Sequence, residues 1–272
     1  MYKYNIKTGR MLMNFNERAA VFKKYRKPDS RFTDKIIELL NINKGSVIAD
    51  IGAGSGKYTI ELMNKGYNVH AVEPCLEMIQ QCINGVDINW IVSFAEEINL
   101  PDEAVDAAII IMAIHHFSDL KRSLKEIYRI VKTGGRVLIF TVDPIVAKGA
   151  WFIDYWSNIA TYIEKYHMDI SDLKNIVSDV FNNKADDYAY EFPHDFQDAF
   201  IYAYWKKPYE LLRKEAQNAM TSFNYVGKHH ANEGSMKLYN DLEAGAWNAK
   251  YSGLLDKSFC DCGCKFIHVI KR

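Results

Sequence analysis

Val47-Ile-Ala-Asp-Ile-Gly-Ala-Gly-Ser-Gly56 joins a short apolar run to three alternating glycines. The apolar part predicts a buried strand over residues 46–51, and residues 58–64 after the glycines have a helical pattern. Glycines in such a strand-to-helix turn let the backbone approach a ligand, and the helix N-terminus offers unpaired N–H donors. The G-x-G-x-G spacing is one residue shorter than the dinucleotide-binding G-x-G-x-x-G, so it favours a ligand without a pyrophosphate. A glycine turn without any ligand is the alternative.

Strand and helix patterns alternate on both sides of this turn. Apolar runs predict strands at residues 46–51, 68–72, 89–93, 105–114 and 136–142. Helical periodicity precedes and separates these strands at residues 32–40, 58–64, 76–83 and 120–131. The alternation implies right-handed crossovers and therefore a doubly wound, mostly parallel α/β sheet. The apolar runs are continuous, as in strands that helices cover on both faces.

The second half of the chain has a different character. It is rich in helical patterns and in Trp, Tyr and Phe, with strand patterns only at 187–192 and 265–270. These two strands bring the predicted sheet to seven, the last of them antiparallel. We expect residues 1–143 to form an N-terminal cap and the ligand-binding core, residues 144–255 a helical lid, and residues 256–272 a strand that returns to the core.

Glu73 follows the strand predicted at residues 68–72 and lies 21 residues after Gly52. A carboxylate at this position can accept hydrogen bonds from both ribose hydroxyls of a nucleoside. A merely solvated carboxylate is the alternative. Together with the glycine spacing, Glu73 indicates a nucleoside cofactor other than NAD.

At this point the chain resembles the class I S-adenosylmethionine-dependent methyltransferases, and within them the methyltransferase type-11 group. The resemblance covers residues 14–142 and implies a Rossmann-like sheet. Five motifs carry it in order, at residues 47–56, 70–74, 93–101, 105–117 and 132–138. Thr133 stands where proline is common in the last motif. Residues 15–28 resemble an N-terminal element that folds over the cofactor, and residues 192–208 and 245–251 resemble a lid-bearing subgroup.

The resemblance also implies a cofactor site for S-adenosylmethionine, with S-adenosylhomocysteine as its product. In that assignment Asp50 orients the methionine amino group, Glu73 holds the ribose, and Ala95 with Glu96 borders the adenine. The complete set of expected cofactor residues is Tyr25, Asp50, Gly52, Ala53, Gly54, Gly56, Glu73, Pro74, Ala95, Glu96, Ile111 and Met112.

The implied reaction is methyl transfer to a small-molecule acceptor by in-line displacement. His115 and His116 follow the fourth strand, where open α/β sheets bind ligands, so each is a candidate general base. A hydrogen-bonded structural histidine is the alternative for either one. For the pair His194 and Asp195 we expect Asp195 to cap a helix.

Composition limits the other function classes. The chain of 272 residues has 34 Lys+Arg and 34 Asp+Glu, so it lacks a general basic field for binding nucleic acid, although a local basic patch stays compatible with this balance. The longest apolar run is too short to span a bilayer, and the residues after Met1 lack a signal-peptide pattern. We therefore expect a cytoplasmic protein with a small-molecule partner and neither nucleic acid nor membrane. The sequence does not indicate an oligomeric state.

Two alternatives stay open, an RNA or protein methyltransferase and a catalytically inactive regulator that binds S-adenosylmethionine. Cys260, Cys262 and Cys264 would share one face of a strand. Their spacing differs from the C-x2-C of zinc sites, so no metal site is predicted. Incidental cysteines and a redox or soft-metal role both remain open for them.

Overall fold

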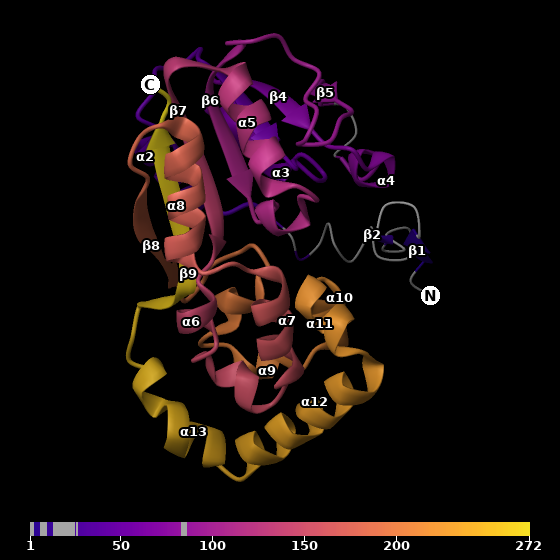
Figure 1. The fold of residues 1–272 in the computed structure, drawn as a ribbon. Helices are drawn as coiled ribbons and strands as arrows, with labels where there is room; N and C mark the ends of the chain where they lie inside the picture. Colours follow the sequence, from indigo (N-terminus) through magenta and orange to yellow (C-terminus); the bar gives the residue numbers. More distant parts are fainter. Residues whose placement is uncertain (1–2, 6–9, 13–24, 26, 83–85) are drawn as a thin grey trace.

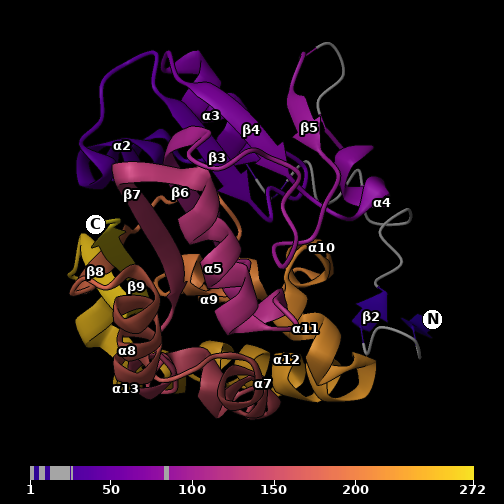
Figure 2. The ribbon, with the colours of Figure 1, turned by 45° about the horizontal axis from the view of Figure 1, so that its top comes forward.

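The structure is a computed structural model of the chain, and it describes residues 3–5, 10–12, 25, 27–82 and 86–272. Within that part, seven strands form one sheet in the order β5-β4-β3-β6-β7-β9-β8 (Figures 1 and 2). Their bounds are β3 Val47–Ile51, β4 Asn68–Val72, β5 Asn89–Ile91, β6 Val105–Ile111, β7 Val131–Val142, β8 Asp186–Pro193 and β9 Phe259–Ile270. The predicted doubly wound, seven-stranded sheet is confirmed.

Strand direction also agrees with the prediction. β3 pairs in parallel with β4 and β6, β4 with β5, and β6 with β7, whereas β9 runs antiparallel between β7 and β8. β9 begins six residues before the predicted strand, because its pairing with β8 continues as far as Phe259 opposite Pro193. The three cysteines therefore lie in a strand, with Gly263 between the last two at a φ of +83°.

Helices cover both faces of the sheet. Their bounds are α2 Ser30–Leu40, α3 Lys57–Asn64, α4 Leu76–Ile79, α5 Leu120–Ile130, α6 Pro144–Ala147, α7 Asn158–Tyr166, α8 Ile170–Phe181, α9 Pro208–Leu211, α10 Lys214–Asn218, α11 Thr221–Val226, α12 Lys228–Glu243 and α13 Ala246–Tyr251. The buried residues of α2 and α3 join one hydrophobic cluster, and those of α5 and α8 join another. A sheet covered in this way explains why its central strands are continuously apolar.

The helix α5 shows how sequence produces this packing. Leu124 and Ile127 are fully buried against the sheet, whereas the charged residues of α5 face outward. The Asp119 side chain caps the helix by accepting from the Arg122 N–H at 3.0 Å. An apolar stripe and a capped N-terminus thus define both the buried face and the start of α5.

Most of the residues predicted as a lid gather at one end of the sheet. Figure 1 shows α7 and α9 to α13 beyond the end toward which β6 and β7 point. Trp156, Trp205 and Trp247 are almost fully buried there, so these tryptophans form the interior of the lid. The helix α8 differs from its neighbours in sequence, because it packs beside α5 on the sheet (Figure 1).

Near the N-terminus, β1 (Lys3–Asn5) and β2 (Arg10–Leu12) pair antiparallel as a separate two-stranded sheet that the sequence patterns did not predict. Of the expected N-terminal cofactor element, Tyr25 is described, while Phe15, Asn16 and Arg26 lie outside the described residues. In the part of the chain that the structure covers, no helix is both long and apolar enough to cross a membrane.

Candidate functional site

The glycine turn connects β3 with α3 at the carboxyl edge of the sheet. Gly52, Gly54 and Gly56 have φ angles of +74°, +61° and +76°, in the left-handed region that favours glycine. An added Cβ on Gly52 would lie 2.5 Å from the Cβ of Ala113, in the segment that follows β6. The turn therefore packs tightly against the end of β6, at the point where the strand order reverses direction and open α/β sheets bind ligands.

Glu73 lies beside this turn, as its place after β4 predicts. Its Oε2 accepts a hydrogen bond from the Gly54 N–H at 2.9 Å, and its Oε1 accepts from the Cys75 N–H at 2.9 Å. Its side chain is largely buried. The carboxylate therefore holds together the ends of two neighbouring strands. Pro74 lies in sequence between Glu73 and the donor Cys75.

Asp50 is the buried acid of the site. Its Oδ2 accepts from the Thr59 hydroxyl at 2.7 Å. Burial raises the pKa of Asp50 to about 6, and the charge of Glu73 adds to this, whereas the Thr59 hydrogen bond and Lys57 oppose it. A carboxyl with this pKa is poised to ionise when a cation approaches, because an opposite charge favours the ionised form.

Glu96, which we expect to border the adenine, connects two loops. Its Oε1 accepts from the Ser118 N–H and hydroxyl, each at 2.6 Å, and from the Asp119 N–H at 3.3 Å. Burial alone would raise the pKa of Glu96, but these hydrogen bonds lower it below the ordinary value. Glu96 thus ties the loop after β5 to the start of α5, while its neighbour Ala95 is buried in the core.

The chain bends sharply after Ile111, the last residue of β6. Met112 has a φ of +52°, which is strained for a residue with a long side chain, and its N–H donates to the Phe140 carbonyl at 2.9 Å. Strained backbone of this kind is concentrated at functional sites. The bend directs the chain toward Gly52 and into the short 3₁₀ turn Ile114–His116.

Three histidines meet just beyond that bend. The ring centroid of His115 lies 4.1 Å from that of His116 and 4.6 Å from that of His167, which follows α7. Burial lowers the pKa of His115 well below its ordinary value and that of His167 to about 4, with the neighbouring histidines adding to the shift. Both rings are therefore uncharged at neutral pH. His167 was absent from the sequence prediction, because no motif connects it with a strand 50 residues earlier.

The histidines line a cavity of about 100 Å³ between the end of β6 and the lid. Its other walls come from α7, from the segment before and within the turn Ile201–Tyr204, and from the start of α11. The lining residues are Met112, His115, His116, Val142, Ile159, Tyr162, Ile163, His167, Ala199, Phe200, Ile201, Tyr202, Met220, Thr221 and Ser222. Within the described part of the chain, this lining holds no Asp, Glu, Lys or Arg.

Asp198 fastens the lid to the helix that follows the glycine turn. It is fully buried, forms an ion pair with Lys57, and accepts a hydrogen bond from the Tyr58 hydroxyl at 2.7 Å. The next N–H, of Ala199, donates to the carbonyl of Tyr25 at 3.0 Å. The wall of the cavity is thus connected directly to α3 and to the N-terminal segment.

The expected helix cap at Asp195 is wrong. Asp195 is exposed and pairs with Arg31 at 2.7 Å, and the chain forms a turn there instead of a helix. Arg31 is held on its other side by the carboxylate of Asp29. Long-range ion pairing, which a local capping pattern cannot reveal, decided the role of this residue.

Cys260, Cys262 and Cys264 are reduced and pack in or against the same core cluster. In the described residues, a set of converging metal-ligating atoms occurs elsewhere, at His229, His230 and Glu233 on α12. All three of those side chains are exposed. An exposed set of this kind is common without a metal ion.

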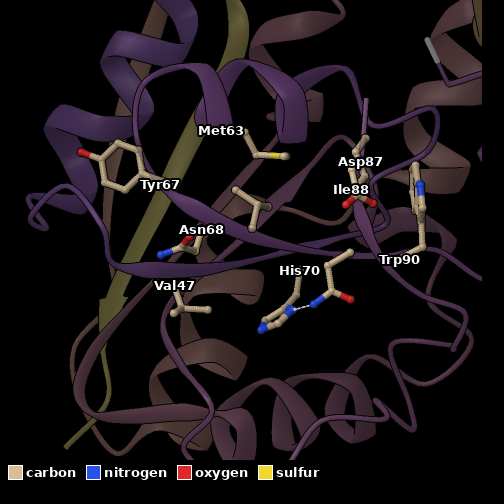
Figure 3. A pocket seen from close by; sticks show the side chains of 10 residues that line it. Val47, Met63, Tyr67, Asn68, His70, Asp87, Ile88 and Trp90 are labelled. Atoms are coloured by element: carbon tan, nitrogen blue, oxygen red, sulfur yellow. Dashed lines mark hydrogen bonds between the residues drawn. The ribbon is translucent and has the colours of Figure 1, made fainter. Parts of the chain in front are cut away.

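A second, wider hollow of about 790 Å³ opens along β4 and β5 (Figure 3). It is lined by the first half of β4 and the residues leading into β5, and Asn89 is hydrogen-bonded to His70 at 2.7 Å within it. The glycine turn and Glu73 lie at the opposite, carboxyl ends of the strands. We therefore place the candidate site at the histidine cavity and the glycine turn.

Comparison with known proteins shows which family the chain resembles. The family described as "Methyltransferase domain" matches residues 49–139. A crystal structure from Anabaena variabilis, named as a putative methyltransferase from an antibiotic biosynthesis pathway, superposes with a TM-score of 0.86 and 35% identity. The alignment covers 90% of this chain and 99% of that one.

Two further relatives are more distant. An uncharacterised methyltransferase of Mycobacterium bovis is 36% identical over 91 residues, which are 33% of this chain and only 37% of that protein's length. Phosphoethanolamine N-methyltransferase 2 of Haemonchus contortus has a TM-score of 0.59 at 17% identity, over 95% of this chain and 58% of that one, so it shares the fold alone.

The sheet order and the glycine turn at the carboxyl edge define a doubly wound α/β protein. With the full-length similarity above, the chain belongs to the class I S-adenosylmethionine-dependent methyltransferases.

Proposed function

We propose that this protein binds S-adenosylmethionine at the carboxyl edge of β3 to β6 and transfers its methyl group to a small-molecule acceptor. The observation that carries the proposal is the contact between Glu73 and Gly54, because it brings a carboxylate for a ribose diol next to a turn that lets the backbone approach. The buried carboxyl of Asp50 suits the positively charged amino group of the methionine part.

The remaining cofactor contacts are proposed from the same edge of the sheet. Gly52, Ala53, Gly54 and Gly56 would line the methionine and ribose, with Pro74 beside the ribose. Ala95 would border the adenine, Ile111 and Met112 would lie along the cofactor, and Tyr25 would cover it. For Glu96, the hydrogen bonds to Ser118 favour a supporting role, in which it fixes the loop that carries Ala95.

The bound cofactor supplies an electrophilic methyl group on a sulfonium, so the protein must position the acceptor, exclude water and accept a proton. The bend at Met112 places the histidine cavity directly after β6, adjoining the glycine turn through Ala113. His115 and His116 are the proposed proton acceptors. A cavity that adjoins the cofactor edge favours an enzyme over an inactive binding protein.

Calorimetric titration tests cofactor binding directly. We expect binding of S-adenosylmethionine and S-adenosylhomocysteine, and no binding of NAD. Release of S-adenosylhomocysteine, followed against panels of phenols, amines, carboxylates, thiols and an RNA pool, tests transfer. Binding of NAD alone would overturn the cofactor assignment, and turnover only with RNA would overturn the acceptor class.

A further inference from the structure

The histidine cavity is lined largely by ring side chains and, among the described residues, by no Asp, Glu, Lys or Arg. Six of its lining side chains are aromatic or imidazole rings, namely His115, His116, Tyr162, His167, Phe200 and Tyr202. Burial raises the pKa of Tyr162 to about 12 and raises that of Tyr202 well above its ordinary value, so both phenols keep their protons. Aromatic walls of this kind favour a flat, aromatic ligand through offset or edge-to-face contacts.

Two ring nitrogens of histidines that line this cavity lack a hydrogen-bond partner among the described residues. The Nδ1 atoms of His115 and His167 are buried, and neither has a partner among the described residues. The His167 side chain is only 7% exposed. A buried polar atom without a partner costs about 1–3 kcal/mol, so such an atom needs a reason to be retained. A ligand that hydrogen-bonds to an imidazole nitrogen would supply one.

A charged ligand would find no oppositely charged Asp, Glu, Lys or Arg side chain among the described residues of this cavity. No Asp, Glu, Lys or Arg lines the cavity within the described ranges. Asp198 precedes the lining residue Ala199, but its carboxylate is buried and paired with Lys57. Burying a carboxylate, phosphate or ammonium without an opposite charge is strongly unfavourable. The cavity therefore selects against ions of either sign.

The volume limits the ligand further. A cavity of about 100 Å³ is smaller than the apolar cavity of roughly 150 Å³ that accommodates benzene in an engineered protein. The methyl-accepting part of the ligand is consequently no larger than about one ring.

We propose that the cavity is the acceptor site, and that it takes an uncharged single-ring aromatic molecule whose hydroxyl hydrogen-bonds to His115 or His167. This inference rests on the proposed function, since it names the acceptor class of the same site. The two histidines act as specificity-determining residues, because they hydrogen-bond to the hydroxyl while the aromatic side chains of the walls contact the ring. His167 belongs to the lid, and His115 to the 3₁₀ turn that follows β6, so residues of both parts recognise the acceptor.

The test uses the full chain saturated with S-adenosylhomocysteine and four single-ring ligands, of which phenol and toluene are matched in size. Phenol, toluene, benzoate and benzylammonium are titrated by calorimetry at pH 7.5. We expect phenol to bind about tenfold more tightly than toluene, as one hydrogen bond worth about 1.4 kcal/mol implies. We expect benzoate and benzylammonium to bind at least tenfold more weakly than phenol.

Matched variants separate recognition from folding. His167→Phe and His115→Phe each keep a ring but remove one Nδ1, so phenol affinity should fall to that of toluene in the variant that loses the hydroxyl's partner, while toluene affinity stays unchanged. His167→Asn retains a polar atom near the position of Nδ1 and should recover part of the difference. His229→Phe, on the exposed surface of α12, should change neither ligand. A purely structural role for His167 would weaken phenol and toluene together.

Several results would overturn the inference. These are equal affinity for phenol and toluene in the wild type, tighter binding of either ion, or no ring ligand bound at all. Each of them leaves the proposed function intact as long as S-adenosylhomocysteine binds. Failure of S-adenosylhomocysteine to bind would overturn the proposed function instead. The wild-type panel remains decisive even where the His167 variants fail to fold.

Discussion

The Oε2 of Glu73 accepts a hydrogen bond from the backbone N–H of Gly54 at 2.9 Å. Two residues 19 positions apart in sequence are thus in direct contact at the ends of β4 and β3. The contact joins the residue proposed for the ribose to the turn proposed for the methionine. Because one carboxylate serves both the turn and the ligand, stability and cofactor affinity are linked at Glu73.

Replacement of Glu73 by alanine should therefore weaken both properties. Two charge-assisted hydrogen bonds to the ribose are lost, so affinity for S-adenosylmethionine should fall about 10- to 1000-fold. The free protein should also lose about 1–3 kcal/mol, because the Gly54 and Cys75 N–H groups lose their acceptor. Calorimetry and chemical denaturation measure the two effects.

Glu73→Gln keeps the shape and one acceptor oxygen, so its affinity should fall between those of the wild type and the alanine variant. Glu38→Ala, on the exposed face of α2, is the control and should leave both quantities unchanged. Wild-type affinity in Glu73→Ala would show that the ribose site lies elsewhere.

Asp50→Asn should change stability and binding in opposite directions. The folded-state pKa of Asp50, about 6, lies above its ordinary 3.8, so the folded protein holds this proton more tightly. The stabilisation is complete below pH 3.8 and is lost as the pH rises through 6. At pH 7.5 the asparagine variant should be more stable by about 2 kcal/mol, yet bind S-adenosylmethionine at least tenfold more weakly.

Thermal unfolding at pH 7.5 and 4.5 checks the sign, because the stability gain should shrink to about a third at the lower pH. Asp106→Asn is the matched control of opposite sign. Burial raises the pKa of Asp106, but hydrogen bonds from Lys132 and Val47 lower it overall, so the variant should lose stability at pH 7.5. A loss of stability in Asp50→Asn would contradict the assignment of a costly buried charge.

Gly52→Ala should destabilise the protein through two separate effects. The φ of +74° costs an alanine about 1–2 kcal/mol, and the new Cβ would lie 2.5 Å from that of Ala113. Gly134→Ala isolates the first effect, because its φ is +80° and no atom lies within 4 Å of the added Cβ. Denaturant unfolding should show a clearly larger loss for Gly52→Ala, and equal losses would argue against close packing of the turn on β6.

The effects of Lys57 and Asp198 on stability should be coupled, because the two side chains form a buried ion pair. Asp198→Ala leaves the Lys57 charge with little access to water, at a cost of about 3–5 kcal/mol. Lys57→Met in the same background should recover part of that loss, because it removes the unpaired charge. A double-mutant cycle by chemical denaturation measures the coupling, and hydrogen exchange of residues 195–205 should increase in Asp198→Ala. Additive losses would mean that the lid is fastened by other contacts.

Acid should destabilise the protein through the buried histidines. The pKa of His167 is about 4 when folded and 6.5 in the ordinary state, so the unfolded chain binds more protons between these values. Stability should thus decline as the pH falls from about 6.5 to 4, by about 3 kcal/mol from this residue. His115 contributes in the same direction, and His116 and Tyr162 are the titratable side chains that face the two rings. His167→Phe should reduce the slope, measured by denaturation across this range, whereas His229→Phe should leave it as it is.

The sequence alone determined the sheet and the edge at which we propose that the cofactor binds. Strands such as β3 and β4 are continuous apolar runs between glycines and helices, so their place and direction follow from local pattern and from the handedness of crossovers. Glu73 and the glycine turn were predictable for the same reason, because the carboxyl ends of neighbouring parallel strands necessarily meet at one edge. The departure at β9 is a difference in length, which depends on its pairing with β8.

Only the tertiary structure decided which side chains meet above that edge. His167 joins His115 because the lid folds back over the sheet, and Asp198 reaches Lys57 across 141 residues for the same reason. Glu96 hydrogen-bonds to Ser118 because two loops converge, a contact that the motif around Glu96 did not predict. Strand and helix formation depend on residues close in sequence, whereas these contacts depend on how large apolar faces pack, and that packing is decided by the whole chain at once.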